Sequence, residues 1–448
     1  MYRVRLLFAG AAFAALICSP TLGRAQGAQP TMPMPNPMAQ PSLSATSPFV
    51  AYLLRNSGSG TSAEPDSTPA PMLMSNRKGW TLMLHGLGFL NLQQQTGPRG
   101  HDKLFAVNWL MGMAEHRLGT GQLTLRAMLS LEPATVTGRM YPELFQTGET
   151  AYGNPIADGQ HPHNFFMELA ALYDLPLGDH GLLSVYAAPM GDPAIGPTAF
   201  PHRASAADDP IAALGHHLED STHISANVIT AGLTYRAVRL EGSIFHGREP
   251  NENRWTVQSG TPDSYSWRVT ASPAPDWSGQ LSWAHLRSPE ALQPQEDQIR
   301  MTASLMYNRK LAAGNWASTL LWGRTRSVGG GNVMNGYLAE SNLEWAKNHA
   351  WTRLENVDRS NDLLLGGAAE PPGFEERFLA RVQACSFGYG HELPSPSWLS
   401  TTLGAQWTLY HAPDALRAIY GAHPQGVALF LRLRLGSEGH RGMRPDLF

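Results

Sequence analysis

The stretch VALFLRLRL (residues 427–435) places two arginines in an otherwise apolar segment. Counted in twos, Val427 and four leucines form one set, whereas Arg432 and Arg434 belong to the other set. Because successive side chains of a β-strand point to opposite faces, this pattern predicts a strand with an apolar environment on one face and a polar environment on the other.

The same two-sided alternation recurs from Trp80 onward. In residues 298–308, for example, Ile299 and Leu305 share one face and Arg300 lies on the opposite face. Three further stretches oppose apolar and polar faces in the same way: residues 123–131, 337–345 and 399–409. The chain is therefore expected to contain many strands that separate an apolar surface from a polar one.

Short turns join the predicted strands in pairs. These turns are expected at residues 117–122, 177–181, 236, 273–277, 311–315, 347–348 and 393–397. Longer polar loops connect the pairs, and the two longest cover residues 132–162 and 190–222. Short turns at one end and long loops at the other are typical of outer-membrane barrels, and with single strands at Trp80 and Val427 the count reaches about 16.

A soluble β-sandwich or propeller also alternates, so alternation alone leaves that alternative open. Three features favour a membrane barrel: strands of about 9–12 residues, full charges in the middle of the polar faces, and tryptophans beside the short turns. The tryptophans are Trp277, Trp316, Trp345, Trp351 and Trp398. Since an open sheet edge is unstable in hydrocarbon, the predicted fold is a closed antiparallel transmembrane β-barrel.

The charged positions of the polar faces are predicted to line the lumen of this barrel. They are Arg126, Arg268, Arg300, Glu340, Glu344, Arg353, Glu355, Arg381, Arg432 and Arg434. Facing positive and negative groups would orient polar solutes and set an ion preference, while the alternative is that they only cross-link the interior through ion pairs. The two longest loops are candidates to fold inward as a constriction.

The N-terminus has the pattern of a cleaved secretory signal, with Arg3 and Arg5 before an apolar run and a small-residue site ending at Ala25. Its removal leaves Cys385 as the sole thiol, which excludes an intramolecular disulfide. The predicted organisation is a signal peptide at 1–25, a disordered leader rich in Met, Pro and Ser at 26–76, a barrel at 77–436 and a C-terminal tail at 437–448.

Between residues 80 and 435 the chain resembles bacterial outer-membrane β-barrel proteins of porin-like architecture. The resemblance implies export to the outer membrane of a Gram-negative bacterium, contact with outer-membrane lipid, and small polar solutes or ions as the other partners. A homo-oligomer is compatible with it. The net charge of −3 and the 15% of charged residues give no sign of a nucleic-acid partner.

Histidines gather in or beside the two longest loops. The candidate metal ligands are His161, His163, His202, His216 and His217. Neutral imidazole with nearby carboxylates suits zinc or copper(II), which are the only cofactors the sequence suggests. Upstream, the leader offers thioethers of the soft type that binds copper(I), at Met32, Met34 and Met38.

The segment DSTHISAN places His223 and Ser225 on one face of a predicted strand. This is similar to the His-x-Ser arrangement of outer-membrane phospholipases, whose serine and histidine face lipid. The resemblance implies that His223 would deprotonate Ser225. Glu249 or Asn251 could orient the imidazole, because the turn near Arg236 brings residues 248–251 roughly opposite His223.

Taken together, the sequence favours a channel for passive or facilitated passage of small polar solutes or ions over an enzyme. The first alternative is a metal-binding or metal-resistance barrel that uses its histidine-rich loops, and the second is a lipid esterase.

Overall fold

The computed structural model describes residues 47–55 and 58–436. The predicted signal peptide, the predicted tail and the part of the predicted leader before residue 47 lie outside these residues. The described residues all belong to one unit, which spans 43–448. Within them, every helix is too short or too polar to cross a membrane.

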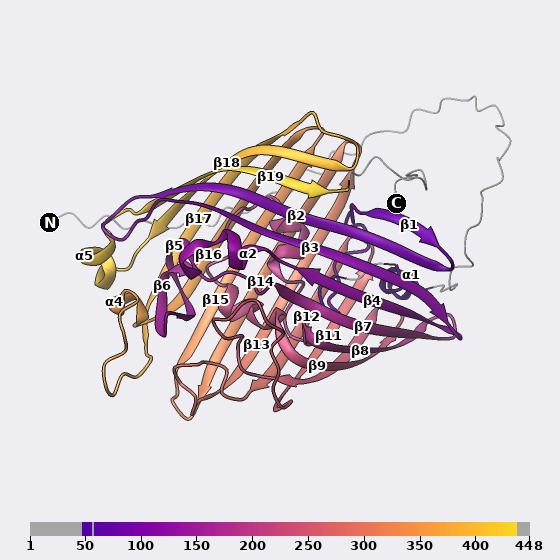
Figure 1. Ribbon diagram of the computed structural model, residues 1–448, viewed down its shortest axis with the longest axis horizontal. Coiled ribbons are helices and arrows are strands. Elements are labelled where there is room, and N and C mark those ends of the chain that lie inside the picture. The colour runs from indigo at the N-terminus through magenta and orange to yellow at the C-terminus, as the bar shows by residue number, and fades with distance from the viewer. Residues whose placement is uncertain (1–46, 56–57, 437–448) are drawn as a thin grey trace. The chain divides into compact units, whose positions relative to one another are not determined.

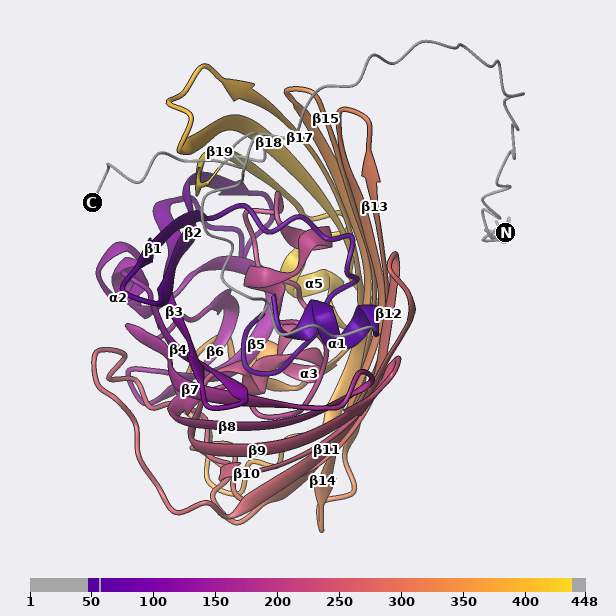
Figure 2. The same ribbon diagram turned by 90° about the vertical axis from the view of Figure 1, so that its right-hand side faces the viewer.

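The described part of the chain forms a closed antiparallel barrel of sixteen strands (Figures 1 and 2). The strands are β2 (Trp80–Gln95), β3 (Lys103–Leu118), β4 (Gly121–Leu129), β7 (Phe166–Leu177), β8 (Gly181–Gly191), β9 (Ser225–Tyr235), β10 (Val238–His246), β11 (Ser264–Ala274), β12 (Trp277–Leu286), β13 (Asp297–Leu311), β14 (Gly314–Val328), β15 (Val333–Trp345), β16 (Asn348–Ser360), β17 (Phe378–Leu393), β18 (Leu399–His411) and β19 (Gln425–Leu435). The last strand closes the ring on the first, with Leu431 opposite Leu90. The predicted fold class is confirmed.

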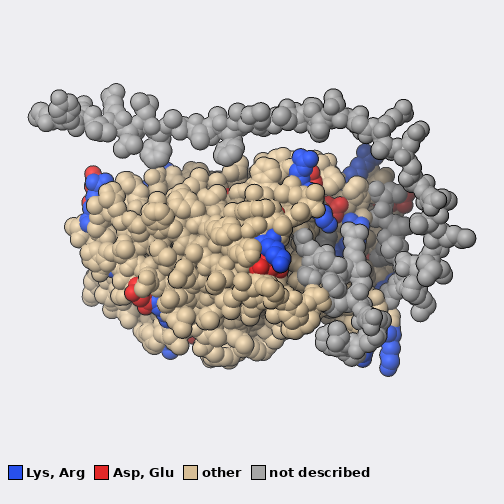
Figure 3. All heavy atoms as spheres, turned by 90° about the horizontal axis from the view of Figure 1, so that it is seen from above, with Lys and Arg blue, Asp and Glu red and all other residues tan. Residues whose placement is uncertain are grey.

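The two faces of the wall differ as the alternation predicts. In β19, Leu429 is 52% exposed on the outside, whereas Arg432 is fully buried inside. Figure 3 shows one side of the barrel as a broad surface with few charged side chains. A closed wall with an apolar outer surface is the arrangement of outer-membrane barrels, because it satisfies backbone hydrogen bonds without water.

Four of the five tryptophans that the sequence analysis places beside short turns are exposed there on the outer surface: Trp277, Trp316, Trp345 and Trp398. Trp351 is an exception and corrects the prediction. It is buried inside the barrel, where its Nε1 donates a hydrogen bond to Gln406 Oε1 at 2.6 Å. Its position beside a turn suggested the membrane surface. However, Trp351 lies two residues before Arg353 in β16, so both side chains point to the lumen.

Residues 47–55 and 58–76 correct the prediction of a disordered leader for this part of it, because they make specific contacts with the barrel. Helix α1 (Pro48–Leu53) buries Phe49 and Val50, and β1 (Leu73–Arg77) pairs with β2 outside the ring. Between them, Ser59 Oγ donates to Asp192 Oδ2 at 2.7 Å, and Ser278 Oγ donates to the carbonyl oxygen of Ala63 at 2.9 Å. This segment, residues 58–72, occupies the short-turn end of the lumen (Figure 2).

Both of the longest loops fold inward, as expected. The first loop contains α2 (Glu132–Thr135), η1 (Thr137–Arg139) and a hairpin of β5 (Tyr141–Ala151) and β6 (Asn154–Gln160). The second, which we call the lumen loop (residues 192–224), contains η2 (Phe200–His202), η3 (Ala204–Ala206), α3 (His216–Glu219) and η4 (Ser221–His223). The outer loops carry α4 (Asp362–Leu365), η5 (Asp414–Leu416) and α5 (Arg417–Tyr420).

The inward segments contact one another and fill most of the lumen. The backbone N–H of Ala212 donates to Tyr141 Oη at 3.2 Å, which joins the two loops. Three of the cavities between these segments measure about 160, 80 and 40 Å³, and one of about 380 Å³ lies beside α1 at the short-turn end. The barrel is therefore plugged by its own chain.

Candidate metal-binding site in the lumen

Nine of the ten predicted lumen residues face the interior. Seven are buried there (Arg126, Arg268, Arg300, Glu340, Arg353, Glu355 and Arg432), and Glu344 and Arg434 are half-buried on the same face. Eight of the nine lie in ion pairs, such as Arg126 with Glu168 at 3.0 Å and Arg434 with Glu344 at 2.9 Å, while Glu355 accepts a hydrogen bond from the Gly215 N–H. These groups thus hold the inward segments against the wall as well as lining it.

Arg381 is the exception and corrects the prediction. In β17 the inward positions are Ala380, Val382 and Ala384, which leaves Arg381 on the outer face. Its guanidinium lies 2.7 Å from an Asp358 carboxylate oxygen and over the Tyr337 ring. A charge was taken as a sign of the lumen, but here it is paired with another charge on the outside near the long-loop end.

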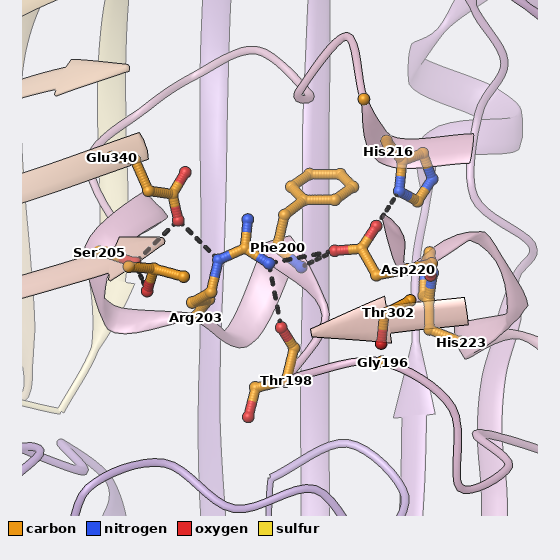
Figure 4. Close-up of polar contacts among 12 residues, drawn as sticks. Gly196, Thr198, Phe200, Arg203, Ser205, His216, Asp220, His223, Thr302 and Glu340 are labelled. Atoms are coloured by element: carbon orange, nitrogen blue, oxygen red, sulfur yellow. Dashed lines mark hydrogen bonds and ion pairs between the residues drawn. The ribbon is translucent and has the colours of Figure 1, made fainter. Parts of the chain in front are cut away.

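A buried ion-pair cluster attaches the lumen loop to the wall. Arg203 lies 2.6 Å from Glu340 of β15 and 3.2 Å from Asp220 of the loop itself. Arg353 of β16 contacts the other oxygen of Glu340 at 3.1 Å and Asp209 at 3.0 Å. Figure 4 shows Asp220 between Arg203 and His216, so the clamp that holds the loop also reaches a histidine.

Two glycines allow α3 to approach the wall closely. Gly323 of β14 and Gly336 of β15 lie directly opposite each other in the ladder. A Cβ at Gly323 would stand 2.3 Å from the carbonyl oxygen of Leu218, and one at Gly336 would stand 3.0 Å from Glu219. A side chain at Gly323 would collide with the backbone of α3, and one at Gly336 would press on the Glu219 carboxylate, so the pair forms a notch that seats α3 and positions its two histidines.

Four of the five predicted metal ligands, together with His223, meet inside the barrel. We call these residues the histidine cluster: His161, His163, His216, His217 and His223. Ring centroids lie 5.2 Å apart for His161 and His217, 5.0 Å for His217 and His216, 5.1 Å for His216 and His223, and 5.4 Å for His223 and His163. Two distant segments of the chain therefore bring their imidazoles into one continuous group.

Three histidines of the cluster, His161, His217 and His223, have environments that favour neutral imidazole, the form that binds metal. Burial is the main cause that lowers the pKa of His223 to about 3 and the pKa of His217 well below its usual value. The nearby His216 is the second cause for both groups. Burial also lowers the pKa of His161, although the adjacent Glu149 opposes this shift. The Nε2 atoms of His163, His217 and His223 are buried and have no hydrogen-bond partner among the described residues.

Two carboxylates and one backbone carbonyl contact the Nδ1 atoms of three of these rings. Asp220 contacts His216 Nδ1, and Glu132 lies 3.0 Å from His163 Nδ1. The Nδ1 atom of His223 is 2.7 Å from the carbonyl oxygen of Asp220. Such contacts fix the ring and raise its basicity as a ligand, as in many metal sites.

Two overlapping groups within the cluster have donor atoms close enough to share an ion. The first consists of His161, His216 and His217, and the second of His216, Asp220 and His223. In each group the donors lie within 4.8 Å of one another. Three nitrogen donors, or two with one carboxylate, are the donor sets that zinc and copper(II) prefer.

His202, the fifth predicted ligand, lies apart from these two groups. It points toward the β2–β3 wall, where its ring packs against Trp109 at 4.2 Å and lies 6.1 Å from the ring of His85. The sequence analysis missed His85. The parity of β2 offered the signal, because His85 alternates with the outward Leu82 and Leu84 and is thus an inward histidine.

The predicted esterase site is wrong in its geometry. Ser225 and His223 are both buried in the lumen rather than facing lipid. Ser225 Oγ donates to the carbonyl oxygen of Thr222 at 2.9 Å, and Glu249 lies 3.2 Å from Arg300 instead of His223. The fold turns this strand entry inward, so the three groups do not form a relay.

No protein-family model and no curated protein matches the chain. Solved structures of outer-membrane porins are similar to it at low identity. An anion-selective porin from Comamonas acidovorans aligns with a TM-score of 0.49 and 13% identity, over 79% of this chain and 99% of the porin. OprB of Pseudomonas putida has a TM-score of 0.48 and 10% identity over 80% and 94%, respectively. OmpF of Salmonella typhi, in complex with daunomycin, aligns with a TM-score of 0.48 and 9% identity, over 81% of this chain and 100% of that chain.

Proposed function

We propose that this outer-membrane barrel binds transition-metal cations in its lumen and passes them along the histidine cluster. The observation that carries the proposal is the group of five imidazole rings in mutual contact inside the plugged barrel. Neutral nitrogen donors in a buried site bind zinc or copper(II), while the filled lumen excludes larger solutes.

The cavities at the two ends of the lumen support a route for a small ion. His217 and Glu149 line the cavity of about 80 Å³ near the long loops, together with Glu290 and Glu376. His85 and His202 line the cavity of about 160 Å³ near the short turns. Between them, His163 and Trp109 line the cavity of about 40 Å³.

We expect the purified full chain to bind Zn(II) and Cu(II), and His216→Ala to weaken this binding most. His216 belongs to both groups of donors, so its loss removes a ligand from each. The dissociation constant is expected to rise by more than the roughly 10- to 100-fold that loss of a supporting contact costs. Isothermal titration calorimetry in detergent measures the effect.

His423→Ala is the matched control, because His423 is exposed on an outer loop and should leave the dissociation constant unchanged. In vesicles that contain the barrel, Zn(II) entry followed by a trapped fluorescent indicator should fall in His216→Ala and not in the control. Entry of a neutral disaccharide as fast as Zn(II) would contradict the proposal and indicate a general porin instead. Equal Zn(II) affinity in His216→Ala and His217→Ala and in the native chain would also contradict it.

A further inference from the structure

We propose a second metal site, specific for a soft monovalent cation such as copper(I) or silver(I), formed by His85, Met111, Met128 and His202. It deepens the proposed function by naming a further class of ion, and it rests on that function only in taking the barrel to admit metal cations. The histidine cluster contributes none of these four residues.

Two imidazole–thioether pairs make up the site. His85 Nε2 lies 3.0 Å from Met111 Sδ, and His202 Nε2 lies 2.8 Å from Met128 Sδ. Two donors that bind one ion at roughly 2.0–2.3 Å are about 3–4 Å apart, so a small opening of each pair would admit an ion. With the proton on Nδ1 of each ring, both Nε2 lone pairs are available to the ion.

The methionines stand on the face of the wall that elsewhere carries charges. Met83, Met111, Met113, Met128 and Met190 all face inward from four strands, and Met167 joins them in one buried cluster. Inward positions of the opposite wall hold groups such as Arg300, Glu340 and Arg353. Methionine also serves as an adaptable filler, but filling alone does not place two histidine nitrogens against two sulfurs.

The surroundings suit a soft monovalent ion rather than a hydrated divalent one. All four donors are uncharged when the histidines are neutral. The Trp109 ring packs against both imidazoles, at 5.1 Å from His85 and 4.2 Å from His202. Thioether and imidazole donors in an apolar shell favour copper(I), and an adjacent indole face adds attraction for a cation.

An access route to the site is present at the short-turn end. The cavity of about 160 Å³ is lined by His85, His202 and Trp109 on one side. On the other side it reaches Glu344 and Arg434 near the ends of β15 and β19. An ion could thus reach the pair of histidines without passing through the histidine cluster.

Titration with silver(I) nitrate in chloride-free buffer tests the site, because silver(I) mimics copper(I) and needs no reductant. The full chain is used with Met32, Met34 and Met38 replaced by leucine, so that leader thioethers do not contribute. We expect one tight silver(I) site per chain that the double variant Met111→Leu, Met128→Leu weakens by at least 100-fold relative to this background. Leucine has nearly the same volume as methionine, which limits disturbance of the fold.

The control is Met306→Leu, which alters a buried inward methionine of β13 on another part of the wall and should leave silver(I) binding unchanged. Zn(II) binding should persist in the double variant, which also verifies that it is folded. Unchanged silver(I) affinity in the double variant overturns the inference, as does loss of silver(I) binding in His216→Ala. If the native chain binds silver(I) but does not bind Zn(II), the proposed function is wrong and the inference of this second site still holds.

Discussion

Replacing Arg203 with methionine is expected to detach the lumen loop and raise the conductance of the barrel. Arg203 is 1% exposed and joins Asp220 of the loop to Glu340 of β15. Its removal leaves Asp220 with no guanidinium partner and leaves Glu340 to share the guanidinium of Arg353 with Asp209. Removing one partner of a buried ion pair costs about 3–5 kcal/mol, which we expect to appear as loss of loop docking rather than of the barrel.

Planar-bilayer recording measures this effect directly, and limited proteolysis from the long-loop side reports the exposed loop. The control is Arg377→Met. Arg377 and its partner Glu375 are 70% and 69% exposed, so solvent screens the pair and its loss should leave the loop docked. A folded Arg203→Met protein with native conductance and native protease resistance would show that the clamp does not hold the plug.

Replacing Leu320 with arginine is expected to lower the free energy of unfolding in lipid vesicles by about 2–4 kcal/mol, the cost of arginine near the bilayer midplane. Leu320 is 58% exposed on the outer face and lies near the middle of β14. Its ladder neighbours Leu305 and Ala339 are likewise central in their strands. Denaturant titration of the refolded barrel gives the free energy.

Leu118→Arg provides the matched control, because Leu118 is 51% exposed but ends β3 beside a short turn. Arginine near the membrane interface costs only about 0–1 kcal/mol. Equal effects at both positions would mean that the outer surface meets water rather than lipid.

The barrel wall could be predicted from the sequence because its signal is local. Alternation in residues 427–435 assigns Leu429 to the outside and Arg432 to the lumen, and the structure agrees at both positions. The turn near Arg236 follows from two flanking runs of period two, which pair as β9 and β10. Each of these features depends only on residues a few positions apart.

The contents of the lumen could not be predicted in the same way. Residues 58–72 read as a flexible leader because they are rich in Ser, Pro and Gly, yet their order comes from contacts such as Ser59 with Asp192, far away in the chain. The histidines were found by residue type, but His161 and His216 meet only because two loops fold inward and α3 fits a glycine notch. Arg381 was misassigned because its partner, Asp358, lies on a neighbouring strand.

The central claim is that histidines from two inward loops meet in the lumen and bind a transition-metal ion. Anomalous diffraction from crystals of the Zn(II)-loaded barrel, measured on both sides of the zinc absorption edge, tests it most directly. The predicted result is a strong anomalous peak between His161, His216 and His217, or between His216, Asp220 and His223, at about 2.0–2.2 Å from the donor atoms. Zinc found only at exposed loop histidines, with the cluster empty, would contradict the claim.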